Sequence, residues 1–111
     1  MDEETRNEIE TLRGVGVSYV GPRLFVRRSI VTDRALIRRW YDDKLKFEGS
    51  PDAWTVDAIG ELGEIERPIV VTVKHVVEGR HRLAAALKYG LPLPVIEVRG
   101  SPSRGFVELK R

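Results

Sequence analysis

Residues 76–87 read VVEGRHRLAAAL, and the rest of the chain is expected to fold around this stretch. Its opening valines are β-branched residues typical of a strand, and Gly79 marks a turn. From Arg80 onward the segment is rich in alanine, the strongest helix former, and its leucines recur at helical spacing. Gly90 follows as a typical C-terminal cap. The stretch therefore predicts a strand, a glycine turn and a helix that ends just before Gly90.

The start of this predicted helix carries an unusual charge. Arg80, His81 and Arg82 place up to three cations in the first turn, where the helix dipole favours anions instead. Free backbone amides from Arg80 to Leu83 would point at phosphate oxygens, and Gly79 would let the backbone approach such a ligand closely. Together with the clustered basic side chains, these features suit a phosphate group. Arginines on helices are also often plain solvated surface charge. The residues alone therefore leave open whether this cluster binds an anion or only faces solvent.

The sequence GRHRLAAA, residues 79–86, resembles the signature of the ParB/sulfiredoxin superfamily, in which a glycine and an arginine open an alanine-rich helix. The flanking segments RPIVV (67–71) and YGLPLPVIEV (89–98) resemble the strands that the family places around this helix. The similarity covers about residues 57–100 and points to the ParB-like N-terminal and ParB-like nuclease domains. With the apolar pattern, it predicts a small α/β (α+β) fold in which helices pack on a mixed sheet.

In that family the glycine turn and the helix start hold a nucleoside triphosphate. The resemblance implies that the phosphates of ATP or CTP are bound by four residues: Gly79, Arg80, His81 and Arg82. Glu78 precedes the turn and is our candidate for a Mg²⁺ ligand and a catalytic carboxylate, although it could also simply balance the local positive charge. Asp57, Glu61 and Glu64 could serve in the same roles or could face solvent, and the sequence selects none of them. Phosphoryl transfer depends mainly on positioning, positive charge and Mg²⁺. The first hypothesis is therefore a nucleotide-binding domain with Mg²⁺-dependent hydrolysis or phosphoryl transfer.

Position 80 distinguishes this chain from two branches of the family. Sulfiredoxins carry their catalytic cysteine where this chain has Arg80, and the chain contains no cysteine, so sulfinic acid reduction is excluded. Partition proteins usually carry a glutamate there. Arg80 could add a further contact to phosphate. Alternatively, it marks a protein that has kept the fold and lost the ligand.

The positive charge is concentrated in one part of the chain. Residues 23–46 contain eight Lys or Arg and three acids, whereas residues 48–66 contain six acids and no Lys or Arg. Such a basic segment is typical of nucleic-acid-binding surfaces and also of solvated helix faces. The second hypothesis is therefore a DNA-binding protein or ParB-like nuclease that uses the same basic cleft on phosphodiesters. Its candidate nucleic-acid contacts are Arg27, Arg28, Arg38 and Arg39.

Length and composition set the broad class. A chain of 111 residues with 41% hydrophobic residues supports one modest core, so we expect a single domain over 1–111. Residues 1–13 are expected to form an N-terminal arm or helix, and residues 101–111 a loop and a possible edge strand. No apolar run is long enough to span a membrane, and no signal peptide is recognisable. We therefore expect a cytoplasmic protein without a membrane partner, and a homodimer stays open.

Hydrophobic periodicity predicts the other elements. A helix capped by Thr32 or Asp33 should bury a stripe that includes Ile37 and Tyr41, and a second helix should begin at Ser50 and Pro51. Lys74 and His75 should form a turn. Neither histidine has the spacing of a metal pair, so a structural zinc site is not expected. The expected strands are 15–19, 24–26, 69–73, 76–77 and 94–98, with an edge strand near 106–109. The run IVVTV at 69–73 is almost continuously apolar, which predicts a strand buried on both faces.

Overall fold

The computed structural model describes residues 23–73 and 76–109, to which all structural statements here refer. The helices are α2 (Arg34–Glu48), α3 (Ala53–Glu61) and α4 (Arg80–Tyr89). The strands are β1 (Leu24–Val31), β2 (Ile69–Val71), β3 (Val76–Glu78), β4 (Leu93–Arg99) and β5 (Val107–Leu109). The expected small α/β fold with a mixed sheet and packed helices is confirmed. The arm expected at 1–13, the strand expected at 15–19 and the turn at 74–75 lie outside the described residues.

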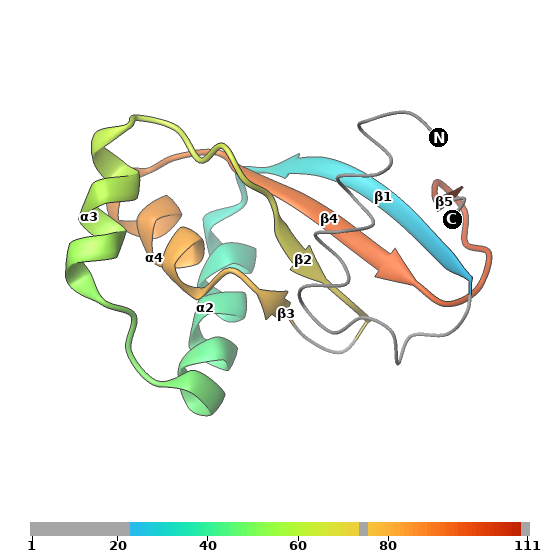
Figure 1. The fold of residues 1–111 in the computed structure, drawn as a ribbon, viewed down its shortest axis with the longest axis horizontal. Coiled ribbons are helices and arrows are strands. Elements are labelled where there is room, and N and C mark those ends of the chain that lie inside the picture. Colours follow the sequence, from blue (N-terminus) through green and yellow to red (C-terminus); the bar gives the residue numbers. More distant parts are fainter. Residues whose placement is uncertain (1–22, 74–75, 110–111) are drawn as a thin grey trace.

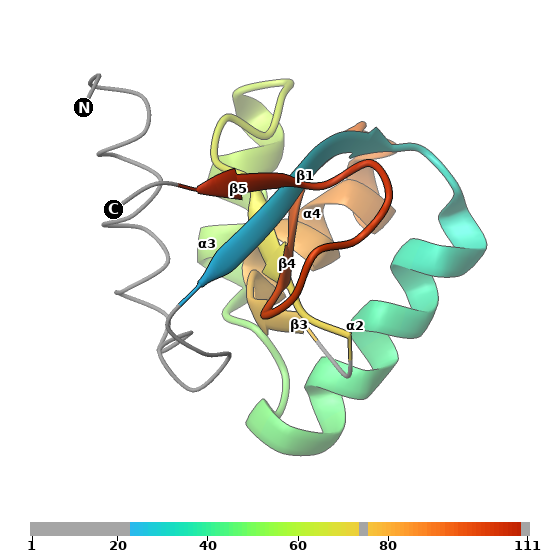
Figure 2. The ribbon, with the colours of Figure 1, turned by 90° about the vertical axis from the view of Figure 1, so that its right-hand side faces the viewer.

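The strands form one sheet in the order β3-β2-β4-β1-β5. β2 and β4 are parallel, and the other neighbours are antiparallel. Figure 1 shows the three helices gathered at one end, while β1 and β4 continue past them toward β5. We call α2, α3 and α4 with β2 and β3 the helix end. We call residues 23–28 and 97–109 the sheet end, and the view in Figure 2 looks onto it.

The core fills both faces of the sheet. Between the helices and the sheet, Ile37, Leu83 and Leu93 are each 0% exposed. The opposite face carries a second cluster, which consists of Leu24, Val26, Val70, Ile96, Val98 and Leu109, with Val77 packed against it. Ile69 and Val70 are adjacent in β2 and belong to different clusters, so this strand is buried on both faces. The continuous apolar run around these residues predicted this arrangement.

Local side-chain chemistry sets the helix ends. Asp33 caps α2 by accepting hydrogen bonds from the amides of Ala35 and Leu36, as one of the two predicted caps. Gly90 ends α4 with a φ of 67°, which also agrees with the prediction. α3 begins at Ala53, later than predicted, because Asp52 rather than Ser50 supplies the cap. None of the helices in the described part is long and apolar enough to cross a membrane.

Two strand lengths differ from expectation. β1 is eight residues long and reaches Val31, whereas the sequence indicated only 24–26. The strand is longer because it pairs with β4 from Phe25 to Val31, a long-range contact that has no local signal. β2 ends at Val71, and Val73 is 73% exposed, so the predicted strand over 69–73 was too long. β5 lies at the edge of the sheet as expected.

Candidate functional site

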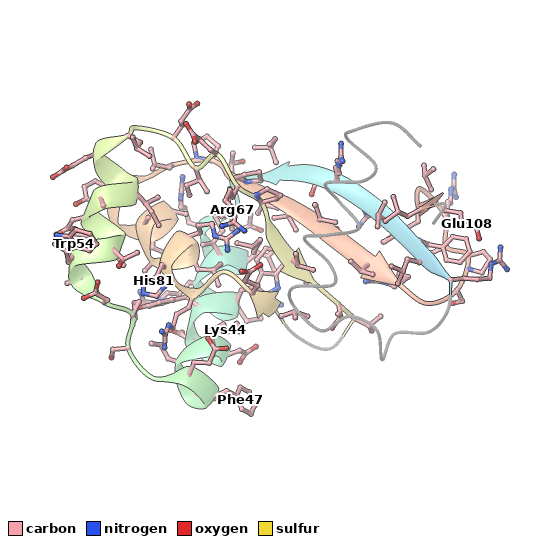
Figure 3. The ribbon with its side chains drawn as sticks, viewed as in Figure 1. Lys44, Phe47, Trp54, Arg67, His81 and Glu108 are labelled. Carbon is pink, nitrogen blue, oxygen red and sulfur yellow. The ribbon has the colours of Figure 1, made fainter. Side chains whose placement is uncertain are left out.

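A hollow of about 450 Å³ lies where β3 turns into α4. This volume is within the range of small-molecule sites in proteins. The basic residues that line it are Lys44, Arg67, Arg80, His81 and Arg82, and the acidic residues are Glu48, Glu64, Glu66 and Glu78. Figure 3 shows three of these side chains, those of Lys44, Arg67 and His81, around the α4 end that adjoins β3. The structure therefore brings the predicted residues 78–82 to one hollow.

Gly79 is required by the packing of the turn. Its φ is 134°, a conformation that residues with a side chain rarely adopt. A Cβ atom at this position would collide with the Ile69 side chain of β2. The sequence suggested that this glycine lets the backbone approach a ligand. The structure gives a different reason, because the residue is buried and lies against its own sheet.

The first turn of α4 opens with uncapped amides. Among the described residues no side chain caps this helix, and none of its first-turn residues is acidic. The Leu83 amide donates to the Gly79 carbonyl at 2.8 Å, so the expectation that it would point at a phosphate is wrong. The amides of Arg80, His81 and Arg82 precede the first helical hydrogen bond. Three amides rather than four are therefore placed to receive an anion.

Arg80 bridges the start of α4 to the end of α2. Its Nη1 donates to the Glu48 carbonyl at 2.5 Å and to the Gly49 carbonyl at 3.4 Å. These carbonyls belong to the C-terminus of α2, where a cation is favoured. Arg80 therefore supports α2, and its buried Nε–H finds no acceptor among the residues that the structure describes.

His81 holds the start of α3. Its Nε2 accepts a hydrogen bond from the amide of Asp52, the α3 cap, at 3.2 Å. Since Nε2 is the acceptor, the ring donates through Nδ1–H in its neutral form. The sequence suggested His81 as a phosphate donor. As long as Nε2 accepts from the Asp52 amide, only the Nδ1–H of the neutral His81 ring can donate to a phosphate.

Arg82 joins the start of β2 to the end of β3. Its Nη1 donates to the Pro68 carbonyl at 2.5 Å, and its Nη2 lies 3.5 Å from Oε1 of Glu78. The Arg82 side chain is only 14% exposed. Burial lowers the pKa of its guanidinium from the ordinary value, and the nearby Glu78 carboxylate opposes that shift. Arg82 is therefore a partly desolvated cation held in a fixed orientation.

Glu78 supplies a carboxylate oxygen with no described partner. Its Oε2 is buried and receives no hydrogen bond, while Oε1 faces Arg82. A carboxylate of this kind fits a Mg²⁺ ion that is held mainly by phosphate oxygens, since Mg²⁺ is commonly bound through only one or two protein carboxylates. Within residues 23–73 and 76–109, no three His, Asp or Glu side chains converge on a metal position. The site therefore fits Mg²⁺ only together with a phosphate ligand.

Lys44 is a site residue that the sequence reasoning missed. It is 7% exposed, and its Nζ contacts Oε1 of Glu48 at 2.7 Å and the Val77 carbonyl at 3.0 Å. A signal was present in the sequence. Lys44 follows Ile37 and Tyr41 at the spacing i, i+4, i+7, so it falls on the buried stripe of α2. A lysine at a core position is rarely buried without a partner.

The four nucleic-acid candidates do not join the hollow. Arg27 and Arg28 lie on β1, Arg38 and Arg39 lie on α2, and none of them lines it. Arg27 donates to Glu97 at 2.8 Å and lies 4.9 Å from the Phe106 ring centroid. Arg38 lies 3.5 Å from Asp42 on the same helix. These four arginines therefore do not form the one basic cleft with residues 79–82 that was expected.

No family model, no curated protein and no solved structure matches the chain. The resemblance to the ParB/sulfiredoxin superfamily accordingly stays a prediction based on the motif at the Gly79 turn.

Proposed function

We propose that this protein binds the triphosphate of a nucleotide, ATP or CTP, in the hollow at the start of α4. One observation carries the proposal. The uncapped amide end of α4 opens into a hollow where Arg80 and Arg82 are oriented by neutral backbone carbonyls. A carbonyl fixes the direction of a guanidinium without cancelling its charge. The helix dipole and both cations therefore act on an anion in the same sense.

The arginines keep donors for a ligand. A guanidinium has five N–H groups, and the hydrogen bonds of Arg80 to Glu48 and Gly49 all come from Nη1. Arg82 faces a carboxylate, but at 3.5 Å the contact with Glu78 is longer than a charge-assisted hydrogen bond. Phosphate oxygens are strong acceptors for such groups. A bound triphosphate would satisfy donors that the described protein leaves open.

Mg²⁺ and Glu78 complete the proposed site. Mg²⁺ would be held by the phosphates and by Glu78, and would supply neutralisation of phosphate charge. Glu78 is also the carboxylate that we propose accepts a proton in hydrolysis or phosphoryl transfer. Its Oε2, which has no described partner, supports this role. The proposed activity is Mg²⁺-dependent hydrolysis of the nucleotide or transfer of its terminal phosphoryl group.

Calorimetric titration with ATP and with CTP, each with and without Mg²⁺, tests this proposal. Arg80→Met removes one cation from the hollow, and Arg23→Met removes one from the sheet end as a matched control. We expect micromolar binding that Arg80→Met weakens about tenfold, since hydrogen bonds to charged groups contribute about 1.5–3 kcal/mol. Arg23→Met should leave binding unchanged. Absence of binding to both nucleotides, or equal losses in the two variants, would overturn the proposal.

A second candidate, DNA binding or cleavage, is favoured by one feature of the sheet end. Arg27 and Arg99 both lie over the Phe106 ring, at 4.9 and 5.0 Å from its centroid. Basic and aromatic side chains interleaved on a sheet are typical of single-stranded nucleic-acid sites. This candidate predicts salt-sensitive binding of a labelled oligonucleotide that Arg99→Met weakens and Arg80→Met does not. Oligonucleotide binding that responds equally to both variants would argue against it.

A further inference from the structure

Lys44 is the most deeply buried charged residue in the hollow. Its side chain is 8% exposed, and two of its three N–H donors are taken by the Glu48 carboxylate and the Val77 carbonyl. Burying an ammonium group is costly unless it is paired. α2 nevertheless places this lysine near the Gly79 turn, where it lines the same hollow as Arg80. A neutral carbonyl alone does not compensate the burial of the Lys44 ammonium group, so an anionic partner is expected beside it.

The present partner of Lys44, Glu48, lies at a helix position that is unfavourable for a carboxylate. It is the last residue of α2, where the helix dipole disfavours a carboxylate. The order Lys44 then Glu48 is also the less favourable one for an i, i+4 pair. The Glu48 side chain is 43% exposed, so it can turn into solvent without a large rearrangement. Its carboxylate is therefore held at 2.7 Å from Lys44 mainly by the lysine itself.

We propose that Lys44 is a phosphate-binding residue of the hollow and that the Glu48 carboxylate occupies its ammonium group until a ligand phosphate displaces it. This inference rests on the proposed triphosphate site. The Val77 carbonyl, at 3.0 Å, keeps Lys44 in place during the exchange. Arg80 holds the backbone carbonyl of Glu48, so only the glutamate side chain has to move.

The exchange limits which anions the hollow accepts. A ligand must compete with a carboxylate that is already tethered beside Lys44. A phosphate group with close to two negative charges has an advantage in that competition over a singly charged carboxylate or chloride. Glu48 therefore makes the hollow selective for highly charged phosphate groups and lowers its affinity for every anion.

Titration with inorganic tripolyphosphate at fixed ionic strength tests the exchange without a nucleoside. Lys44→Met removes the ammonium and keeps the buried stem, and Lys46→Met removes an exposed lysine from the same helix as its control. Glu48→Gln removes the competing carboxylate, and Asp42→Asn breaks the other i, i+4 pair of α2 as its control. We expect Lys44→Met to weaken binding about 10- to 100-fold and Glu48→Gln to tighten it about tenfold. Neither control should change the affinity.

The outcomes separate this inference from the function on which it rests. If the wild type binds tripolyphosphate and both test variants match their controls, Lys44 is only a structural tie and this inference is overturned, while the triphosphate site stands. If neither the wild type nor Glu48→Gln binds, the triphosphate site itself is wrong. Thermal unfolding of each variant verifies that it is folded. If Lys44→Met does not fold, tighter binding by Glu48→Gln supports the exchange, and unchanged or weaker binding overturns it.

Discussion

The helix end and the sheet end both carry arginines, but the two ends hold them in different ways. At the sheet end, Arg23 pairs with Glu108 at 3.0 Å and Arg27 pairs with Glu97 at 2.8 Å, on an exposed surface. At the helix end, Arg80 and Arg82 donate mainly to backbone carbonyls inside a hollow. Carboxylates cancel charge where they bind it, and carbonyls do not. The partners of an arginine, more than the number of arginines, therefore indicate where an anion can bind.

The glycines of the two ends offer the largest expected contrast. Gly79→Ala would force a side chain into a φ of 134° and into the Ile69 side chain, so we expect a loss of about 3 kcal/mol or more. Gly105→Ala at the sheet end meets nothing closer than 3.8 Å at a φ of 84°, and should cost about 1–2 kcal/mol. Urea unfolding of both variants measures the difference. Equal losses would show that the Gly79 turn is not packed as described.

Removing the partly buried Arg82 should have the next largest effect. Arg82→Met leaves the Pro68 carbonyl without its donor and the Glu78 carboxylate without its paired cation, so we expect a loss of about 2–3 kcal/mol. Arg23→Met removes an exposed ion pair and should leave the unfolding midpoint almost unchanged. Denaturant titration of the two proteins compares them directly. A similar midpoint in both would contradict the structural role assigned to Arg82.

The smallest expected effect is a pH dependence at the contact between α3 and α4. The hydrogen bond from Lys88, followed in size by the one from Tyr89, lowers the pKa of Asp57. The same contacts raise the pKa of Lys88 and the pKa of Tyr89. Because the pKa of Asp57 is lower in the folded state, its contact stabilises the fold at pH values above the unfolded pKa of about 4. This contribution is lost as the pH falls through the folded pKa. Because the pKa values of Lys88 and Tyr89 are raised in the folded state, their contact stabilises the fold at pH values below about 10. That contribution is lost as the pH rises through the folded pKa values.

Asp57→Asn measures this contribution. We expect the variant to have a flatter profile of unfolding midpoint against pH than the wild type, both below pH 4 and above pH 10. The matched control is Asp42→Asn, which removes an exposed carboxylate of α2 from its pair with Arg38. If Asp57→Asn kept the full wild-type slope on both sides, the Asp57 contact would not contribute to stability.

Local patterns predicted what depends on neighbours in sequence. The helix after Gly79, its end at Gly90 and the burial of Ile69 and Val70 all follow from propensity and periodicity, and the structure confirms them. The full length of β1 was not predictable in this way. Its second half, residues 28–31, is strand because it pairs with residues 93–96 of β4, which lie 62 to 68 positions later in the chain.

The sequence predicted where the candidate site lies in the chain, but it did not predict which residues its side chains contact. Clustered cations beside a glycine turn pointed to residues 79–82, and these residues do line one hollow. Their partners come from distant segments, since Arg80 contacts the end of α2 and Arg82 contacts Pro68. Lys44 was overlooked because its charge was counted with a basic segment, although its helical position marked it as buried.

A map of backbone amide chemical shifts during titration with ATP and with CTP tests whether a triphosphate binds at the start of α4. We expect saturable shifts at the amides of Arg80, His81 and Arg82, with little change at Arg27 and Phe106 of the sheet end. The response should be retained with tripolyphosphate, because the contacts are to phosphate. Shifts that centre on the sheet end, or that never saturate at the start of α4, would contradict the account.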